Sequence, residues 1–407
     1  MTMTEKRKCI VCGGEDFSLL MTLDNMPANA QNMPDENGLK DDKPLKLDLC
    51  QCKKCGLVQF AVDPVYYYKD VIRAGGGTTT MRNLRHDEYK KLLQAMRDNG
   101  IEGRRIVEVG CGRGEFLAMW SDLDDEDTAK LDLMGIENSA DLVKTGQNNG
   151  LNICKNFAEG DNIYSEQKFD AFVQFNFLEH QPYPADMLRN IWKNLKDKAL
   201  GLVTVPSFEY IIENDGYYEL MRDHIAYYTI DTMSYLFENN GFKVLNSRFV
   251  NRDTIELLVE KVNMPESEVA PSEIKSVDVS NLKENFSEIK AVIEKHVNEL
   301  NTSGKKLAIW GASHQTFTLA ATTELNGKVS YIIDSADFKQ GKYSPVSHLL
   351  IASSDYFFEN PVDEILIVAP GYTDEIAGII KEKFGDKVRV LTLKDKSIKD
   401  YLTGEVI

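Results

Sequence analysis

Apolar runs alternate with amphipathic helical patterns from about residue 106 to residue 262, and the alternation begins again near residue 304. The first stretch predicts strands over IVEVG, LDLMGIE, FDAFVQF and ALGLVTV, followed by a hairpin of GFKVLNSRFV and TIELLVEKV. Strands that alternate with helices are typical of a doubly wound parallel sheet. We therefore expect an α/β protein with two Rossmann-like units in one chain.

Breaks in this pattern divide the chain into four segments. We expect a small cysteine-containing domain over 1–70 and the first Rossmann-like domain over 71–262. The acids and prolines of NMPESEVAPSEIKS mark the next boundary, so 263–303 is predicted to be a linker with a polar helix at about 280–300. The second Rossmann-like domain is expected over 304–407. A chain of 407 residues is too long for one ordinary core.

The sequence IVEVGCGRGEF contains the most informative motif. Gly110, Gly112 and Gly114 follow an apolar strand at alternate positions, behind the acidic Glu108. Such glycines let the backbone turn sharply and approach a ligand, and the helix that follows offers unpaired N–H groups. About one βαβ step later, Glu137 ends the next apolar run, where a carboxylate can accept hydrogen bonds from two ribose hydroxyls.

This GxGxG spacing differs from the GxGxxG of dinucleotide-binding motifs and suits an adenosyl cofactor. The strand, glycines, helix and second acid together resemble the class I S-adenosylmethionine-dependent methyltransferases. The alternative is an ordinary Rossmann-like turn with incidental acids.

Two further segments supply candidate ligand contacts. FDAFVQFNFLEHQ is a strand that ends at Asn176, Glu179 and His180, and strand C-termini form the ligand crevice of open α/β sheets. Asn176 is a predicted cofactor contact. The loop RAGGGTTTMR carries glycines 75–77, which can flex or approach a ligand closely, and Thr78, which is a further predicted cofactor contact. This loop is either a lid or a plain linker.

Five of the seven cysteines lie within the first 55 residues. Cys9 and Cys12 form one CxxC pair, and Cys52 and Cys55 form a second, so that four thiolates are available for a tetrahedral structural zinc. The 39 residues between the pairs exceed the usual spacing of about 15 to 20. Cys50 is either a spare thiol or a substitute ligand. The alternative is a set of free cysteines in a reducing compartment.

Composition excludes several classes of protein. The net charge of −17 argues against a nucleic-acid surface, because phosphate neutralisation needs clustered Lys and Arg. No run approaches the roughly 18 apolar residues of a membrane helix, and MTMTEKRK lacks the apolar stretch of a signal peptide. We therefore expect a cytoplasmic protein with a small-molecule substrate and no membrane partner. The sequence leaves the oligomeric state open, a monomer included.

From end to end, the chain resembles the zinc-containing sugar C-methyltransferases. The matching stretches are CIVC with CKKCGLVQF, RAGGGTTTMR, VEVGCGRGEFL, VPSFEYIIENDGYYELMRDHIAYYT, and LAIWGAS with IIDSADFKQGKYSP and ILIVAPGYTDEI. The resemblance implies a zinc domain, a methyltransferase domain and a second α/β domain. It also implies carbon methylation of a nucleotide-linked 4-keto-6-deoxysugar, in which a base removes the proton beside the ketone and the enolate carbon takes the methyl group.

The resemblance assigns the catalytic base to His224, in the segment DHIAYYT, and the acid before it to Asp223, where the family usually has glutamate. A neutral imidazole accepts a proton near neutral pH, and an adjacent carboxylate can stabilise the imidazolium. His180 is a rival base at a strand end, although a structural role is favoured for it. His314 is a candidate contact for a substrate phosphate or sugar hydroxyl. The alternative for His224 is a hydrogen-bonded structural residue.

One departure from the family concerns a tyrosine. The residue three positions before the histidine is Met221 here, which removes a phenol that can act as acid, base or enolate stabiliser. Tyr227, Tyr228 or the cluster at residues 66–68 are candidates to replace it.

This departure leaves the methylated atom open, and two functions of other classes are also weighed. An O- or N-methyltransferase needs only an aligned nucleophile and one base. A non-catalytic scaffold with a methyltransferase fold is disfavoured by the intact cofactor motif. An NAD-dependent oxidoreductase that uses the terminal unit is disfavoured by WGASHQT, which carries one glycine.

Overall fold

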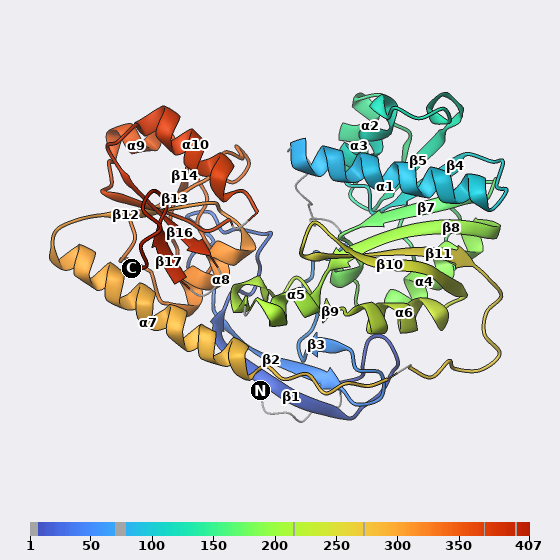
Figure 1. Cartoon of the computed structure of the whole chain (residues 1–407), viewed down its shortest axis with the longest axis horizontal. Helices are drawn as coiled ribbons and strands as arrows, with labels where there is room; N and C mark the ends of the chain where they lie inside the picture. Colours follow the sequence, from blue (N-terminus) through green and yellow to red (C-terminus); the bar gives the residue numbers. More distant parts are fainter. Residues whose placement is uncertain (1–6, 70–78, 215, 272, 370, 395–396) are drawn as a thin grey trace.

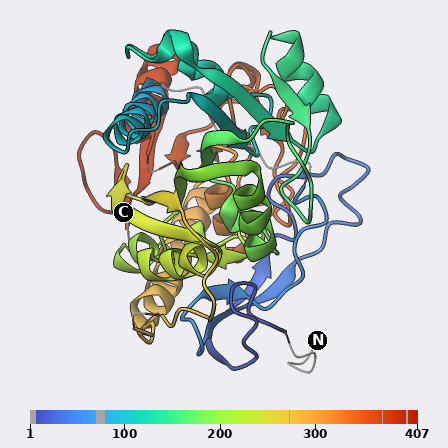
Figure 2. The same ribbon diagram turned by 90° about the vertical axis from the view of Figure 1, so that its right-hand side faces the viewer.

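The computed structural model describes residues 7–69, 79–214, 216–271, 273–369, 371–394 and 397–407. Within these ranges the strands form three β-sheets (Figure 1). A small N-terminal sheet lies beneath two larger α/β units, which carry the central and the C-terminal parts of the chain. The view of Figure 2, turned by 90°, also places the blue N-terminal segments below the cyan and green elements of the central unit. The α/β fold class expected from the sequence is confirmed.

The N-terminal sheet is antiparallel and includes one strand from far along the chain. Its order is β1-β2-β3-β9, with β1 at Phe17–Met26, β2 at Leu45–Cys52, β3 at Val58–Phe60 and β9 at Ala226–Tyr227. Val58 pairs with Tyr227 and Gln59 with Ala226. This pairing attaches the segment that carries His224 to the cysteine-containing domain. The domain limits proposed from the sequence stay predictions.

The central sheet has seven strands in the order β10-β11-β8-β7-β4-β5-β6. The parallel strands are β4 (Arg105–Val109), β5 (Asp132–Glu137), β6 (Ile153–Lys155), β7 (Phe169–Phe175) and β8 (Leu195–Pro206). The antiparallel hairpin of β10 (Phe242–Val250) and β11 (Thr254–Lys261) completes the sheet beside β8. The strands and the hairpin predicted from the apolar runs are confirmed. All seven residues of β7 are buried, because both faces of the sheet are covered by helices.

Two sets of helices cover this sheet. One face packs against α1 (Thr79–Asp98), α2 (Glu115–Met119) and α3 (Ala140–Asn148). The other packs against α4 (Pro184–Asn194) and α6 (Ile230–Glu238), with the cysteine-containing knuckles in the same core. Shorter elements connect the strands: α5 (Phe208–Glu213), η1 (Trp120–Asp122), η2 (Thr128–Lys130), η3 (Leu178–His180) and η4 (Tyr217–Glu219).

The C-terminal unit is the second Rossmann-like domain that the sequence predicts. Its sheet has the order β14-β13-β12-β15-β16-β17, with strands at Leu307–Trp310 (β12), Ile332–Ile333 (β13), Ile351–Ala352 (β14), Glu364–Ile367 (β15), Arg389–Lys394 (β16) and Ser397–Asp400 (β17). All pairs are parallel except that of β16 with β17. Its helices are α7 (Ser280–Thr302), α8 (His314–Thr322), α9 (Tyr356–Glu359) and α10 (Thr373–Phe384). The polar helix expected at about 280–300 is α7.

One apolar core joins the N-terminal sheet to the C-terminal unit. It contains Leu23 and Leu49 from the small sheet, Met221 from the central unit, and Ile293 and Phe317 from α7 and α8. Each of these side chains is at most 3% exposed. The segment around Met221 is therefore held between three parts of the molecule.

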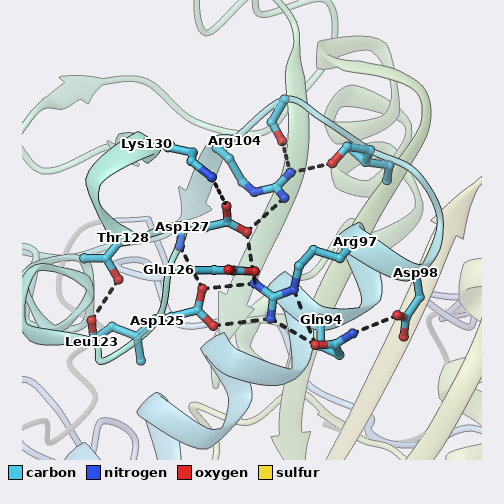
Figure 3. Close-up of polar contacts among 12 residues, drawn as sticks. Gln94, Arg97, Asp98, Arg104, Leu123, Asp125, Glu126, Asp127, Thr128 and Lys130 are labelled. Carbon is cyan, nitrogen blue, oxygen red and sulfur yellow. Dashed lines mark hydrogen bonds and ion pairs between the residues drawn. The ribbon is translucent and has the colours of Figure 1, made fainter.

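A charged network fixes the C-terminal end of α1 against the loop that leads into β5 (Figure 3). Asp127 lies 2.9 Å from Arg97, 2.9 Å from Arg104 and 3.0 Å from Lys130. Burial opposes ionisation of Asp127, but the hydrogen bonds from the three cations outweigh it and lower its pKa to about 2.

No helix of the described part of the chain has both the length and the apolar character needed to cross a bilayer.

Candidate functional site

The glycine turn after β4 has the conformation that its sequence predicts. Gly110, Gly112 and Gly114 have φ angles of 74°, 58° and 87°, which residues with a side chain rarely adopt. A Cβ atom on Gly110 would lie 2.8 Å from the ring of Phe177, and one on Gly114 would lie 2.4 Å from Leu151 Cδ1. Glycine is therefore favoured at all three positions by the turn, and at Gly110 and Gly114 by the packing as well.

Glu137 lies directly against this turn. Its Oε2 atom accepts a hydrogen bond of 3.0 Å from the backbone N–H of Gly112, and Oε1 accepts one of 2.8 Å from Ser139. Next to it is a small hollow at the surface of the turn. The lining residues include Lys69, Gly110, Glu137, Phe157 and Phe177. The structure thus brings together the second acid and the glycines that the sequence assigned to one site.

Glu108, in β4, and Asn176, which follows β7, both lie near the guanidinium group of Arg85. Glu108 is 2% exposed, and its Oε2 atom has no hydrogen-bond partner among the described residues. Burial raises its pKa to about 8, against the opposing charge of Arg85. Asn176 has a φ of 48°, and its Oδ1 atom accepts hydrogen bonds from Thr204 (3.3 Å) and Arg85 (3.4 Å). Thr78 and the glycines at 75–77 lie outside the described residues.

Sequence reasoning missed Arg85, a buried cation on α1. Its guanidinium carbon lies 3.9 Å from the ring centroid of Phe175 and 4.6 Å from that of Phe116, and it also forms an ion pair with the buried Glu88. The sequence feature that could have revealed it is an Arg and a Glu three residues apart on the apolar face of a predicted helix.

The four thiols of the two CxxC pairs converge at one point. Cys9 Sγ lies 3.5 Å from Cys55 Sγ, Cys12 Sγ lies 3.6 Å from Cys52 Sγ, and all four sulfur atoms lie within 4.8 Å of one another. Zn–S bonds of about 2.3 Å place the sulfurs of a tetrahedral site about 3.8 Å apart. The geometry therefore fits a zinc ion.

The two knuckles that carry these thiols have the same local form. Each pair is followed by a glycine of positive φ, 69° at Gly13 and 81° at Gly56. Each of these glycines donates its N–H to the carbonyl of the first cysteine of its pair, at 2.9 Å. Cys50 lies apart from the four-thiol group, with its Sγ 3.9 Å from the carbonyl oxygen of Asp48.

Three histidines that are distant in the sequence gather where the central and C-terminal units meet. His180 comes from η3, His224 from the segment before β9, and His314 from the first turn of α8. The ring centroid of His224 lies 4.7 Å from that of His180 and 5.9 Å from that of His314. His314 Nε2 is paired with Glu219 at 3.2 Å. His180 is buried, whereas His224 is partly exposed.

Burial controls the protonation of these groups. It lowers the pKa of His180 to about 4, partly offset by the hydrogen bond with the Asp223 carbonyl. The pKa of His224 is held well below 6.5 by burial and by the neighbouring His180 and His314. The adjacent Glu179 is 2% exposed, and burial raises its pKa to about 8. At neutral pH both imidazoles are therefore uncharged, and His224 has a lone pair that can accept a proton.

The carboxylate of Asp223 is turned to the N-terminal domain and away from a direct role beside His224. Its Oδ1 atom accepts a hydrogen bond of 2.6 Å from Tyr67, and Oδ2 accepts one of 3.0 Å from the Ala30 N–H. The backbone carbonyl of Asp223 instead lies 2.7 Å from His180 Nδ1. Asp223 thus ties the segment of His224 to both the N-terminal loop and η3.

The phenol of Tyr227 is engaged with the backbone of Met221. It accepts a hydrogen bond of 2.8 Å from the Met221 N–H and donates one of 3.1 Å to the Met221 carbonyl. The Tyr228 hydroxyl is buried and has no hydrogen-bond partner within the described ranges. Of the two, the structure leaves Tyr228 as the phenol with capacity for a further partner.

Two protein families match the chain. A methyltransferase domain covers residues 81–247, and a C-methyltransferase C-terminal domain covers residues 242–391. The C-methyltransferase NovU of Streptomyces niveus is 21% identical over 402 residues, a match that covers 92% of this chain and 92% of NovU. The ubiquinone biosynthesis O-methyltransferase of Glaesserella parasuis serovar 5 is 27% identical over 116 residues, or 26% of this chain and 47% of that protein.

Solved methyltransferase structures are also similar to part of the chain. The plantazolicin methyltransferase BpumL in complex with SAH matches with a TM-score of 0.36 and 13% identity, covering 45% of this chain and 84% of that protein. Magnesium protoporphyrin IX methyltransferase from Synechocystis PCC 6803 with bound SAM gives a TM-score of 0.33 and 12% identity, covering 48% and 88%.

Proposed function

We propose that this protein, which belongs to the S-adenosylmethionine-dependent C-methyltransferases, methylates a carbon atom of a nucleotide-linked 4-keto-6-deoxysugar. The observation that carries this proposal is the position of His224. It is a neutral, partly exposed imidazole beside His180 of the central unit and His314 of the C-terminal unit. Carbon methylation needs such a base, because a C–H group must lose its proton before the carbon can act as a nucleophile.

The cofactor site that we propose is the turn after β4 with its two acids. Gly110, Gly112 and Gly114 form the backbone cradle, and Glu137 reaches the ribose after exchanging its present partners, the Gly112 and Ser139 N–H groups. Glu108, Asn176 and Thr78 complete the set assigned from the sequence. S-adenosylmethionine supplies an electrophilic methyl group when it is bound there.

His224 acts as the base in this proposal, and its neighbours position it. Its ring nitrogen accepts the proton from the carbon beside the ketone, and its lowered pKa keeps that nitrogen unprotonated in the free protein. His180 and Asp223 position His224 through the 2.7 Å contact between their segments. Tyr227 holds the backbone of Met221 three residues before the base. Asp223 is thus a positioning residue and does not itself take the proton.

The remaining assignments concern zinc and the nucleotide. We assign a structural zinc to Cys9, Cys12, Cys52 and Cys55, because four thiolates fill a tetrahedral shell and leave no open position. His314, at the first turn of α8 and paired with Glu219, is a candidate contact for a substrate phosphate, which a helix N-terminus favours, or for a sugar hydroxyl.

The experiment that tests the function is NMR of the products formed from methyl-labelled S-adenosylmethionine and a panel of nucleotide-linked 4-keto-6-deoxysugars. A labelled methyl group on a sugar carbon supports the proposal. A label on oxygen or nitrogen contradicts it and identifies Met221 as a sign of altered chemistry. Transfer to none of the sugars, by a protein that binds the cofactor, contradicts the sugar assignment.

A further inference from the structure

Beside the proposed base lies a second group of side chains with the character of a metal site. Glu179, His180 and His224 each present one ligand atom, and these atoms all lie within 4.8 Å of one another. We propose that these three residues bind a divalent transition-metal ion, at a site separate from the four cysteines.

The orientation of His180 matches that of a metal ligand. Its Nδ1 atom is 2.7 Å from the backbone carbonyl of Asp223, so that Nδ1–H donates there and the lone pair is on Nε2. Metal-bound histidines generally donate their other N–H to a carbonyl or a carboxylate in this way. The Nε2 atom, which carries the lone pair, faces the carboxyl group of Glu179 and lies 3.8 Å from its Oε1 atom.

Glu179 supplies the independent observation that points to a ligand. Its side chain is 3% exposed, and its Oε2 atom is buried with no hydrogen-bond partner in the part of the chain that the structure describes. The other oxygen, Oε1, is the one that faces His180. A buried carboxyl oxygen without a partner is costly, and a cation bound to the group offsets that cost. The group is placed beside two imidazole rings whose centroids are 4.7 Å apart.

The donor set and the spacing indicate which ion is suitable. Two imidazoles and one carboxylate favour zinc, cobalt or ferrous iron over calcium or magnesium. Metal–ligand bonds of about 2.0–2.1 Å place the donors of a tetrahedral site about 3.4 Å apart. The 3.8 Å separation between Nε2 and Oε1 is close to that value. His224 is partly exposed, which gives the ion a route from solvent and leaves one side of the site open.

Other histidine and carboxylate pairs lack this convergence. His296 with Glu364 and His348 with Asp42 each bring together one histidine and one acid. Neither pair belongs to a group of three potential ligands among the described residues. The pair of His348 therefore offers a matched control for weak surface binding.

One consequence rests on the proposed function. If His224 is the base, a metal ion bound to its ring nitrogen occupies the lone pair that accepts the proton. The ion then inhibits turnover without displacing the cofactor. Metal binding itself does not depend on that role, so the two proposals fail separately.

The test is a titration of the zinc-loaded protein with Co²⁺, followed by calorimetry and by visible absorption. We expect about one Co²⁺ per chain, without the thiolate-to-cobalt charge-transfer band that exchange at the cysteines produces. In Glu179→Gln and His180→Asn the Kd for Co²⁺ should rise by at least the roughly 10–100-fold seen when an outer partner of a metal ligand is lost. His348→Asn should keep the Kd of the original protein.

Two results would overturn the site. In the first, the protein binds no Co²⁺, or every bound Co²⁺ shows the thiolate charge-transfer band. In the second, the Kd for Co²⁺ is unchanged in both ligand variants. Binding of S-adenosylhomocysteine by each variant shows that the variant is folded. If one of the two ligand variants does not fold, the other still tests the site. If Co²⁺ binds as expected but sugar methylation is not observed, the metal site stands and the proposed function falls.

Discussion

The Nδ1 atom of His180 lies 2.7 Å from the backbone carbonyl oxygen of Asp223, although 43 positions separate the two residues. This contact joins the C-terminal end of β7, where methyl-transfer chemistry is expected, to the segment that carries His224. The same Asp223 accepts hydrogen bonds from Tyr67 and Ala30 of the N-terminal domain. The sequence suggested Asp223 as an electrostatic partner of His224. The structure shows instead that Asp223 positions His224, and that its backbone carbonyl makes the contact with His180.

Replacing the proposed base should abolish catalysis and leave cofactor binding intact. We expect His224→Gln to reduce kcat by about 10²–10⁴-fold, the usual contribution of a general base. Its affinity for S-adenosylmethionine should stay close to that of the original protein, measured by calorimetry. His348→Gln, which changes a histidine paired with Asp42 elsewhere, is the control. Full activity in His224→Gln would remove this residue from the mechanism.

The pH dependence of turnover should reflect the environment of His224. A base works in its neutral form, which predominates above its pKa, and burial with two neighbouring histidines holds that pKa well below 6.5. We therefore expect kcat/KM to stay level as the pH falls through 6.5 and to decline only in more acid solution. The measurement is a pH profile of kcat/KM, with unfolding monitored at each pH. An acid limb centred at 6.5 or above is incompatible with this assignment.

The four-thiol group should hold zinc. Metal analysis of the purified protein is expected to find about one zinc per chain at the four thiols, counted apart from any ion at Glu179, His180 and His224. Cys52→Ser should lose the metal and lower the thermal stability, because a structural zinc contributes directly to folding. Cys50→Ser is a matched control, since Cys50 is two positions before Cys52 in the sequence and lies outside the four-thiol group. Metal-free protein, or equal zinc in both variants, contradicts the assignment.

The contact of Glu137 with the glycine turn predicts a specific loss of cofactor affinity. In Glu137→Gln, one of the two oxygens proposed to accept hydrogen bonds from the ribose hydroxyls becomes an NH₂ donor. Loss of a hydrogen bond to a charged group corresponds to roughly 1.5–3 kcal/mol, or about 10- to 150-fold in Kd. Calorimetry with S-adenosylhomocysteine measures this change. Glu115→Gln, which removes a more exposed acid in the first turn of α2, should have little effect.

The network around Asp127 should make stability depend on pH in a defined range. The pKa of Asp127 is about 2 in the folded protein and 3.8 in the reference state, so its contribution is present above pH 3.8 and is lost as the pH falls towards 2. Asp127→Asn should lower the free energy of unfolding by about 1–3 kcal/mol at neutral pH. Urea unfolding at several pH values measures the difference between the two proteins, which should narrow below pH 4. Asp161→Asn, at an exposed ion pair with Lys193, is the control.

The sequence by itself determined the features that depend on neighbouring residues. The strands of the central sheet, the glycine turn with Glu108 and the two CxxC knuckles follow from local pattern, because periodicity and backbone freedom act over a few positions. The second Rossmann-like unit and the helix α7 were predicted on the same basis.

Only the tertiary structure decided which distant side chains meet and how they point. It turned the Asp223 carboxylate to Tyr67, buried Glu179 beside two histidines, and placed Arg85 against two aromatic rings. It also added β9 to the N-terminal sheet. These outcomes depend on the packing of segments that are far apart in the chain, and the desolvation and hydrogen bonds that set the pKa of each group arise from that packing.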